Sequence, residues 1–166
     1  MNQQFGPKEL LLCDHRPMEA VIYIGIQGSG KTTFYLRQFF NTHVRISLDM
    51  LKTRHRERLL LEACLTAKQP FVIDNTNATI AQRSNYIQPS REAGFRITGL
   101  YFRADVKAAL ERNAARTGRF RIPEKGLLGT LKRLERPNLS EGFDQLNYVS
   151  IDSEGNFVVE SWRDEI

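Results

Sequence analysis

The sequence predicts one α/β domain with a parallel sheet and helices on both of its faces. Apolar runs of strand length alternate along the chain with segments whose apolar residues have helical spacing. One glycine-rich loop, Gly25–Thr32, lies between an apolar run and a helical segment, in the strand–loop–helix order of a phosphate-binding loop. A chain of 166 residues suffices for one such core, over about 20–151, within a single domain 1–166.

The first predicted elements lie on both sides of the glycine-rich loop. Ala20–Ile26 is an apolar strand, and Thr33–Phe40 has its apolar residues at helical spacing. Val44–Leu48 is a short apolar strand that ends at Asp49. Arg54–Lys68 is predicted to be helical because its apolar residues recur on one face.

The alternation continues through the middle of the chain. Phe71–Asp74 is a buried strand, and Ile80–Ala93 is a helix that Pro89 is expected to kink or interrupt. Arg96–Phe102 is a fourth strand. The next helix is marked by the apolar residues Val106, Ala109 and Leu110.

One more helix and two terminal strands complete the prediction. Leu127, Leu131 and Leu134 mark the helix, and Leu146–Ile151 and Phe157–Trp162 are the strands. In a parallel α/β sheet, ligands bind at the carboxyl ends of the strands, so the site is expected at that edge.

The glycine-rich loop is a complete Walker A motif. Gly30 and Lys31 form its invariant pair, and Thr32 supplies the hydroxyl. The loop points backbone N–H groups and a helix N-terminus at one place, which suits the phosphates of ATP. Lys31 is expected to reach the β- and γ-phosphates, and Thr32 to hold Mg²⁺. The predicted nucleotide-binding residues are Gly25, Gln27, Gly28, Ser29, Gly30, Lys31, Thr32 and Thr33, together with Arg116 further along the chain.

Two acidic residues end neighbouring strands beside this loop. Asp74 has the place of a Walker B acid, which can hold Mg²⁺ or steady the loop. Asp49 is a candidate general base that accepts a proton from an acceptor hydroxyl. Each aspartate can instead cap the helix that follows it, and for Asp49 alone the two interpretations are equally good.

Basic residues gather in two segments. Residues 103–136 hold ten Lys or Arg against four Asp or Glu, as in a lid over transferring phosphate at about 112–124. Arg116 is the preferred catalytic arginine there, although a solvated basic helix end explains the same charges. The second segment is 52–58, which begins three residues after Asp49. Lys52 lies nearest Asp49 there and is a candidate contact for a phosphate on the acceptor.

Composition limits the setting. Lys and Arg exceed Asp and Glu by five (24 minus 19), which permits an anionic partner without proving one. Two separated cysteines and the lack of a membrane span or secretory segment predict a reduced, cytoplasmic protein with no membrane partner.

Four places in the chain resemble the polynucleotide 5′-hydroxyl kinase family, over about Val21–Val149. The Walker A loop is generic. Ile73–Asn77 (Ile-Asp-Asn-Thr-Asn) and Ser140–Phe143 (Ser-Glu-Gly-Phe) are similar to the kinase half of animal polynucleotide kinase-phosphatases. Arg112–Arg116, with Ile-Pro after it, is similar to the lid of the phage enzyme.

The resemblance implies a P-loop kinase three-layer sandwich whose five parallel core strands have the order 2-3-1-4-5. It implies ATP and Mg²⁺ as cofactors, Asp49 as general base, Lys52 as a contact for substrate phosphate, and Arg116 as the catalytic arginine. The implied partners are single-stranded or nicked nucleic-acid ends and separate repair enzymes. The chain departs from the family at Ser47-Leu48, where Asn-Arg is usual. This departure affects the identification of the acceptor more than the prediction that ATP is bound.

Two other functions remain open on the sequence alone. Related P-loop kinases phosphorylate sugars, antibiotics or nucleotide-sugars with the same fold and base, because the fold and Walker A loop do not name the acceptor. A nucleotide-switched binding protein that hydrolyses ATP without an acceptor is the third interpretation. Asp49 disfavours it, since a switch needs a water-positioning group.

Overall fold

The computed structural model describes residues 18–103, 106–115, 117–118 and 122–163. All its strands belong to one sheet with the order β2-β3-β1-β4-β5-β6. The strands are β1 (Glu19–Ile24), β2 (Val44–Ile46), β3 (Phe71–Ile73), β4 (Arg96–Phe102), β5 (Gln145–Ile151) and β6 (Phe157–Ser161). Strands β1 to β5 are parallel, and β6 pairs antiparallel with β5.

The predicted α/β class and the order 2-3-1-4-5 are confirmed, with β6 added at the edge. The helices are α1 (Lys31–Gln38), α2 (Leu48–Leu51), α3 (Arg54–Ala67), α4 (Ile80–Glu92), α5 (Val106–Ala114) and α6 (Glu124–Arg133). A 3₁₀ turn, η3 (Leu139–Glu141), precedes β5. In the part of the chain that the structure describes, no helix is long and apolar enough to span a bilayer.

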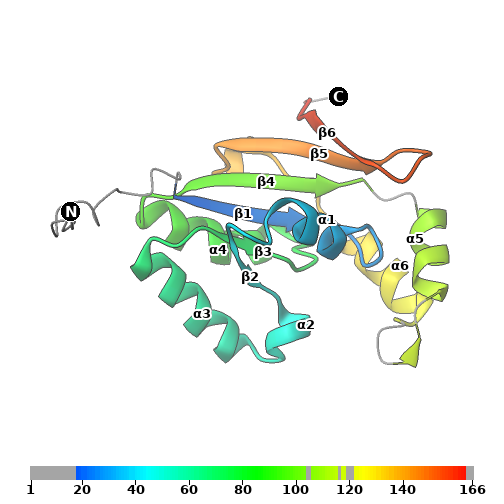
Figure 1. The fold of residues 1–166 in the computed structure, drawn as a ribbon, viewed down its shortest axis with the longest axis horizontal. Helices are drawn as coiled ribbons and strands as arrows, with labels where there is room; N and C mark the ends of the chain where they lie inside the picture. The colour runs from blue at the N-terminus through cyan, green and yellow to red at the C-terminus, as the bar shows by residue number, and fades with distance from the viewer. Residues whose placement is uncertain (1–17, 104–105, 116, 119–121, 164–166) are drawn as a thin grey trace, which may run out of the picture.

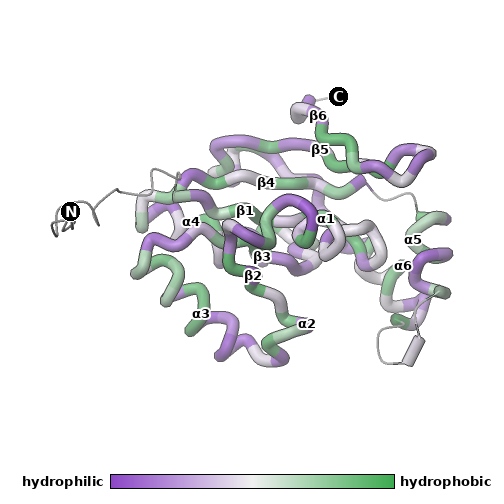
Figure 2. Tube along the Cα trace, viewed as in Figure 1, coloured by the Kyte–Doolittle hydropathy of each residue, from purple (hydrophilic) through white to green (hydrophobic). Residues whose placement is uncertain are grey.

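Alternating side chains of the central strands divide the core into two layers. In β1, Ile22 and Ile24 join one cluster with residues of α3 and α4, whereas Val21 and Tyr23 join another with residues of α1. Figure 2 shows the complementary pattern on α3, where hydrophilic and hydrophobic segments alternate. The period of two in the strands and the helical period in α3 therefore place helices on both faces of the sheet.

Two local expectations change in the structure. Helix α4 is not interrupted at Pro89: it begins at the Thr79–Gln82 capping box and continues to Glu92. The backbone N–H of Ala93 then donates to the carbonyl of Pro89, so the helix ends in an ordinary way after losing one bond at the proline. Strand β2 ends at Ile46, and Asp49 lies in the first turn of α2 rather than at a strand end.

The carboxyl ends of the strands carry the helices that build the site. Figure 1 shows α1, α5 and α6 gathered toward the arrowheads of β1 and β4, with α2 below them. These elements come from distant parts of the sequence. A parallel sheet brings them together because all of its crossovers return the chain to the same edge.

Candidate active site

The loop between β1 and α1 has the backbone shape of an anion cradle. Gly28 and Gly30 have φ values of 78° and 94°, a region that side chains disfavour. A Cβ atom added to Gly28 would lie 2.8 Å from the carbonyl oxygen of Ala109 in α5. Glycine is therefore required at Gly28 both for the turn and for the close approach of α5.

Lys31 is held inside this loop. Its ammonium nitrogen lies 2.9 Å from the carbonyl oxygen of Gly25 and 2.6 Å from that of Ile26. The hydroxyl of Ser29 also donates to the Ile26 carbonyl, at 2.9 Å. The cation thus lies at the centre of the loop, where it can meet an anion bound by the backbone N–H groups.

Thr32 and Asp74 meet across the sheet edge, as the motif predicts. The Thr32 hydroxyl donates to Oδ2 of Asp74 at 2.9 Å, and Asp74 is buried. A hydroxyl and a carboxylate are the hard oxygen donors that Mg²⁺ prefers. These two residues therefore fit a magnesium ion beside the phosphate-binding loop.

The sequence analysis did not identify Arg45, which contacts both of these residues. Its Nε and Nη2 atoms each lie 2.7 Å from Oδ2 of Asp74, and Nη2 donates to the Thr32 hydroxyl at 3.2 Å. Its guanidinium also lies over the Tyr35 ring. The sequence does contain a signal for this contact, because Arg45 is a single arginine within the apolar strand Val44–Ile46. A half-buried cation in a strand needs an acidic partner.

Asp49 faces the same cavity as the loop. The cavity has a volume of about 290 Å³, and the exposed Asp49 lines it together with Lys31, Thr32 and Asp74. The remaining lining residues are Gln27, Gly28, Gly30, Thr33, Leu48, Arg54, Asn75, Thr76, Asn77, Gln82 and Ile122. One cavity therefore joins the candidate base to the candidate phosphate and metal ligands.

A buried polar network fixes the helix that carries Asp49. Oδ1 of Asn75 accepts the backbone N–H of Leu48 at 2.9 Å, and its Nδ2 donates to Glu57 at 2.7 Å. Glu57 also accepts the hydroxyl of Tyr86 at 2.9 Å and an N–H of Arg54 at 2.7 Å. Burial, with the charge of Glu57, raises the pKa of Tyr86 to about 12, so the phenol stays a donor.

Lys52 lies beside Asp49 but outside this cavity. It ends α2 with a left-handed φ of 69°, and its exposed ammonium donates to the backbone carbonyl of Asp49. The residues that line the cavity within the described ranges do not include it.

Polar contacts connect the lid segment and α6 to the loop and hold the lid segment together. Nε of Arg112 donates to the carbonyl of Gly28 at 2.7 Å. The Asn113 amide exchanges two hydrogen bonds with the backbone of Ile122, at 2.6 and 3.0 Å. Gln27 donates to the Thr130 hydroxyl at 3.1 Å. Arg116, the predicted catalytic arginine, lies outside the described residues.

The other residues of the Ile73–Asn77 motif support the loop from below. The carbonyl of Thr76 accepts the backbone N–H of Gly25 at 3.0 Å. Asn77 has a φ of 45° and donates to the carbonyl of Tyr23 at 2.7 Å. Gly25 and Thr76 thus hold the glycine loop against the loop that follows β3.

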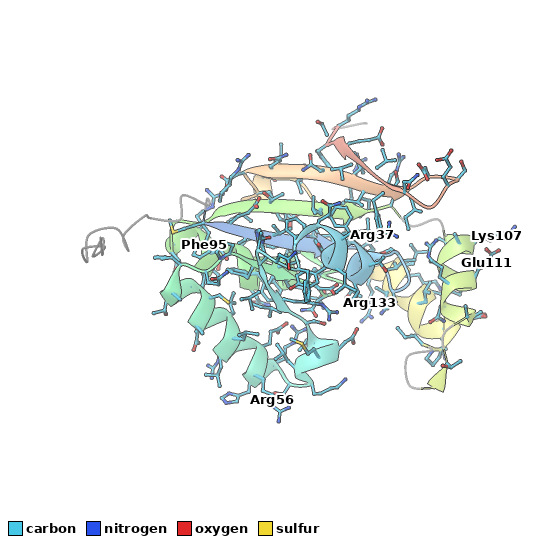
Figure 3. All side chains as sticks on the ribbon, viewed as in Figure 1. Arg37, Arg56, Phe95, Lys107, Glu111 and Arg133 are labelled. Atoms are coloured by element: carbon cyan, nitrogen blue, oxygen red, sulfur yellow. The ribbon has the colours of Figure 1, made fainter. Side chains whose placement is uncertain are left out.

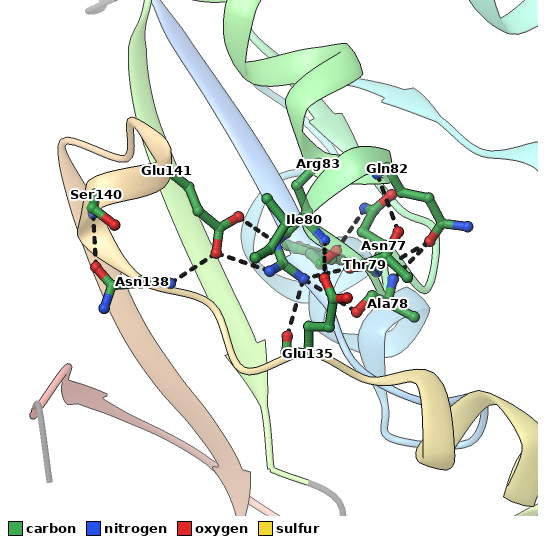
Figure 4. A network of polar contacts seen from close by, with 11 residues as sticks. Asn77, Ala78, Thr79, Ile80, Gln82, Arg83, Glu135, Asn138, Ser140 and Glu141 are labelled. Atoms are coloured by element: carbon green, nitrogen blue, oxygen red, sulfur yellow. Dashed lines mark hydrogen bonds and ion pairs between the residues drawn. The ribbon is translucent and has the colours of Figure 1, made fainter. Parts of the chain in front are cut away.

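The Ser140–Phe143 motif is connected to that loop through a buried arginine. Arg83 of α4 is fully buried and bonds both carboxylate oxygens of Glu141, at 2.6 and 2.8 Å (Figure 4). It also donates to the backbone carbonyls of Asn77, Ala78 and Glu135. The sequence analysis did not single out Arg83, because nothing in its helical pattern distinguishes it from a surface arginine.

Comparisons with known proteins identify the family and the fold of the chain. A family model described as "AAA domain" matches residues 21–137. A protein of Schizosaccharomyces pombe named bifunctional polynucleotide phosphatase/kinase is 27% identical over 152 residues, which cover 89% of this chain and 37% of that relative. The chain thus spans little more than a third of the length of this curated relative.

Solved structures of related fold include Kti12 of Chaetomium thermophilum in complex with ADP-AlF3, with a TM-score of 0.58, 18% identity, and coverage of 82% of this chain and 92% of that one. A gluconokinase of Sinorhizobium meliloti 1021 has a TM-score of 0.55 and 20% identity, covering 81% and 84% of the two chains. At these identities the likeness establishes the fold, which is that of P-loop kinases.

Proposed function

We propose that this chain, which belongs to the AAA-domain family matched by its residues 21–137, is a kinase dependent on ATP and Mg²⁺. The acceptor that we propose is the 5′-hydroxyl at the end of a polynucleotide. The observation that carries this proposal is the single cavity lined by Lys31, Thr32, Asp49 and Asp74. The polynucleotide acceptor is supported by the relative from Schizosaccharomyces pombe and by the motifs that resemble the 5′-kinases.

The residues of the cavity divide the work of phosphoryl transfer. The backbone N–H groups of Gly28–Thr32 and the ammonium of Lys31 bind the phosphates of ATP. Asp49 accepts the proton of the acceptor hydroxyl while that oxygen forms a bond to the γ-phosphorus and the bond to the departing ADP oxygen breaks. Thr32 and Asp74 would hold Mg²⁺, which supplies charge neutralisation at the phosphate oxygens when bound.

Arg116 completes the proposed set. In the family that the chain resembles, the matching arginine neutralises charge on the phosphoryl group in transfer. Four residues earlier in the chain, Arg112 donates to the carbonyl of Gly28 in the phosphate-binding loop.

The deciding experiment measures transfer of the γ-phosphate of ATP to a short single-stranded oligonucleotide with a free 5′-hydroxyl. The same oligonucleotide with a 5′-phosphate is the control. Transfer to the first alone is the expected result. If neither is phosphorylated while ATP is bound, the polynucleotide acceptor is wrong, and the fold shared with gluconokinase makes a small-molecule hydroxyl the next acceptor to test. If the chain hydrolyses ATP and no acceptor raises the rate, the result favours a nucleotide-switched binding protein instead.

A further inference from the structure

Arg54 lines the same cavity as Asp49, at the first position of α3. Within the described residues, Lys31 and Arg54 are the two basic residues that line the cavity. Lys31 is held inside the phosphate-binding loop, so it serves the nucleotide. Arg54 is the cation left for a second anionic group.

The Arg54 guanidinium is held at one end. Its Nη1 donates to Oε2 of Glu57 at 2.7 Å and to the hydroxyl of Tyr86 at 2.9 Å, and both partners are buried. Its Nε and Nη2 groups make no hydrogen bond to any residue that the structure describes. The side chain is 62% exposed, so these groups are open to a ligand.

The same network relates Arg54 to the candidate base. Asn75 bonds Glu57 with its amide nitrogen and the backbone N–H of Leu48 with its amide oxygen. Leu48 directly precedes Asp49, so Arg54 and Asp49 are both positioned by the Glu57–Asn75 pair. Burial alone would lower the pKa of Arg54, but the hydrogen bond to Glu57 raises it above its usual value. Arg54 is therefore always cationic.

We propose that Arg54 binds a phosphate of the acceptor, namely the phosphodiester next to the hydroxyl that Asp49 deprotonates. Arg54 thereby selects acceptors that carry this phosphate. The Nε and Nη2 groups form a planar fork that matches two phosphate oxygens. This inference rests on the proposed function, since it names what the acceptor of that site must carry.

Lys52 is the competing candidate for this contact, because the family resemblance assigns it the role. Its ammonium donates to the backbone carbonyl of Asp49, and it does not line the cavity within the described ranges. Arg54 lines the cavity and has two free donors there. The geometry therefore favours Arg54.

The test compares acceptors with and without the phosphate. A nucleoside, its 3′-monophosphate and a dinucleotide, all with a free 5′-hydroxyl, are phosphorylated by the parent chain and by Arg54→Gln. The variant is expected to lower kcat/KM by about 10- to 100-fold for the two phosphate-bearing acceptors, as for the loss of a charged hydrogen bond. For the nucleoside the change is expected to stay within about twofold.

Arg56→Gln is the matched control. Arg56 lies two residues further along the same helix, is exposed, and does not line the cavity within the described residues. Figure 3 shows its side chain pointing away from the body of the molecule. This variant is expected to keep the preference for phosphate-bearing acceptors. Tyr86→Phe, which loses one bond to Arg54 but keeps the cation, is expected to weaken the preference by less than Arg54→Gln.

Three outcomes bear against the inference or its premise. An equal loss with all three acceptors overturns the role of Arg54 in phosphate binding, and so does a selective loss in Lys52→Gln but not in Arg54→Gln. If the parent chain phosphorylates none of the three, the polynucleotide acceptor is wrong. In that case, binding of a sugar phosphate and of the unphosphorylated sugar is compared between the parent chain and Arg54→Gln. If the variant binds only the sugar phosphate more weakly, Arg54 is a phosphate contact for a small molecule. If the variant binds both compounds as the parent does, the inference is overturned.

Discussion

At the scale of single residues, the two carboxylates among the described residues that line the cavity have different surroundings. Asp74 is nearly enclosed and its Oδ2 accepts bonds from Arg45 and Thr32. Asp49 is exposed and lines the cavity. The first carboxylate is thus held in place by a positive charge, whereas the second remains available to a proton from an acceptor.

Replacement of Asp49 tests the candidate base. Asp49→Asn is expected to lower the transfer rate by about 10²-fold or more, because an amide cannot accept the proton. The affinity for ADP, measured by calorimetry, is expected to stay unchanged, since the phosphate-binding loop is intact. Glu160→Gln on the exposed edge strand is the control. An unaltered transfer rate in Asp49→Asn would remove Asp49 from the mechanism.

Arg45 occupies the two groups that would hold Mg²⁺. Arg45→Met is therefore expected to lower, several-fold, the Mg²⁺ concentration at which ADP binding is half-maximal, because the guanidinium no longer competes for Asp74 and Thr32. Titration calorimetry at a series of Mg²⁺ concentrations measures this. Arg37→Met, an exposed arginine of α1, is the control. Equal Mg²⁺ dependence in parent and Arg45→Met would show that the arginine does not compete.

At the scale of elements, one buried ion pair, Arg83–Glu141, joins α4 to the η3 turn. Arg83→Met leaves Glu141 buried without its partner and is expected to lower the free energy of unfolding by about 3–5 kcal/mol. Arg91→Met breaks the half-exposed contact with Asp144 and is expected to cost at most about 1 kcal/mol. Urea denaturation of both variants measures the difference. Similar losses in the two would mean that the buried pair is not special.

The contact between the phosphate-binding loop and α5 is also an element-scale feature. Gly28→Ala places a methyl group against the Ala109 carbonyl and a side chain at φ 78°, so ADP affinity is expected to fall by about 10-fold or more. Gly129→Ala in α6 has open space and is expected to raise stability by about 0.4–1 kcal/mol without altering ADP affinity. Calorimetry and thermal unfolding provide the two readouts. Unchanged ADP affinity in Gly28→Ala would mean that α5 can move freely.

At the scale of the whole molecule, two buried groups of the core lower the free energy of unfolding at alkaline pH. Burial raises the pKa of the Cys64 thiol from 9.0 to about 11 and, with the charge of Glu57, that of Tyr86 from 10.0 to about 12. Both groups keep their protons longer when folded. Their stabilising effect is complete below the unfolded pKa values and is lost as pH rises through the folded ones.

The free energy of unfolding is therefore expected to fall between about pH 9 and pH 12, by roughly 2–3 kcal/mol for each of the two groups. Urea denaturation at intervals across this range measures the fall. Cys64→Ala removes one of the two groups, so its curve is expected to be shallower than that of the parent chain. Parallel curves for parent and variant would show that Cys64 does not titrate on unfolding.

The sequence by itself determined the fold class and the glycine loop, whereas the strand order followed from the resemblance to a known family. Alternation of apolar runs with helical spacing is a local property, and so is the strand–loop–helix order around the glycine-rich motif. The helix predicted over Ile80–Ala93 is present as Ile80–Glu92, and of the kink or interruption expected at Pro89 the interruption does not occur. One proline removes one bond, and the capping box and packing of the helix outweigh that loss.

The tertiary structure alone decided which charges meet. Arg45 is 29 residues from Asp74, Arg83 is 58 residues from Glu141, and Arg54 is 32 residues from Tyr86. Spacing along the chain cannot reveal these pairs, because helical and strand periods relate only near neighbours. Parallel crossovers return all of these segments to one side of the molecule. Burial of Asp74, Glu57 and the Arg83–Glu141 pair makes an unpaired charge costly there, and so it fixes which side chains must join.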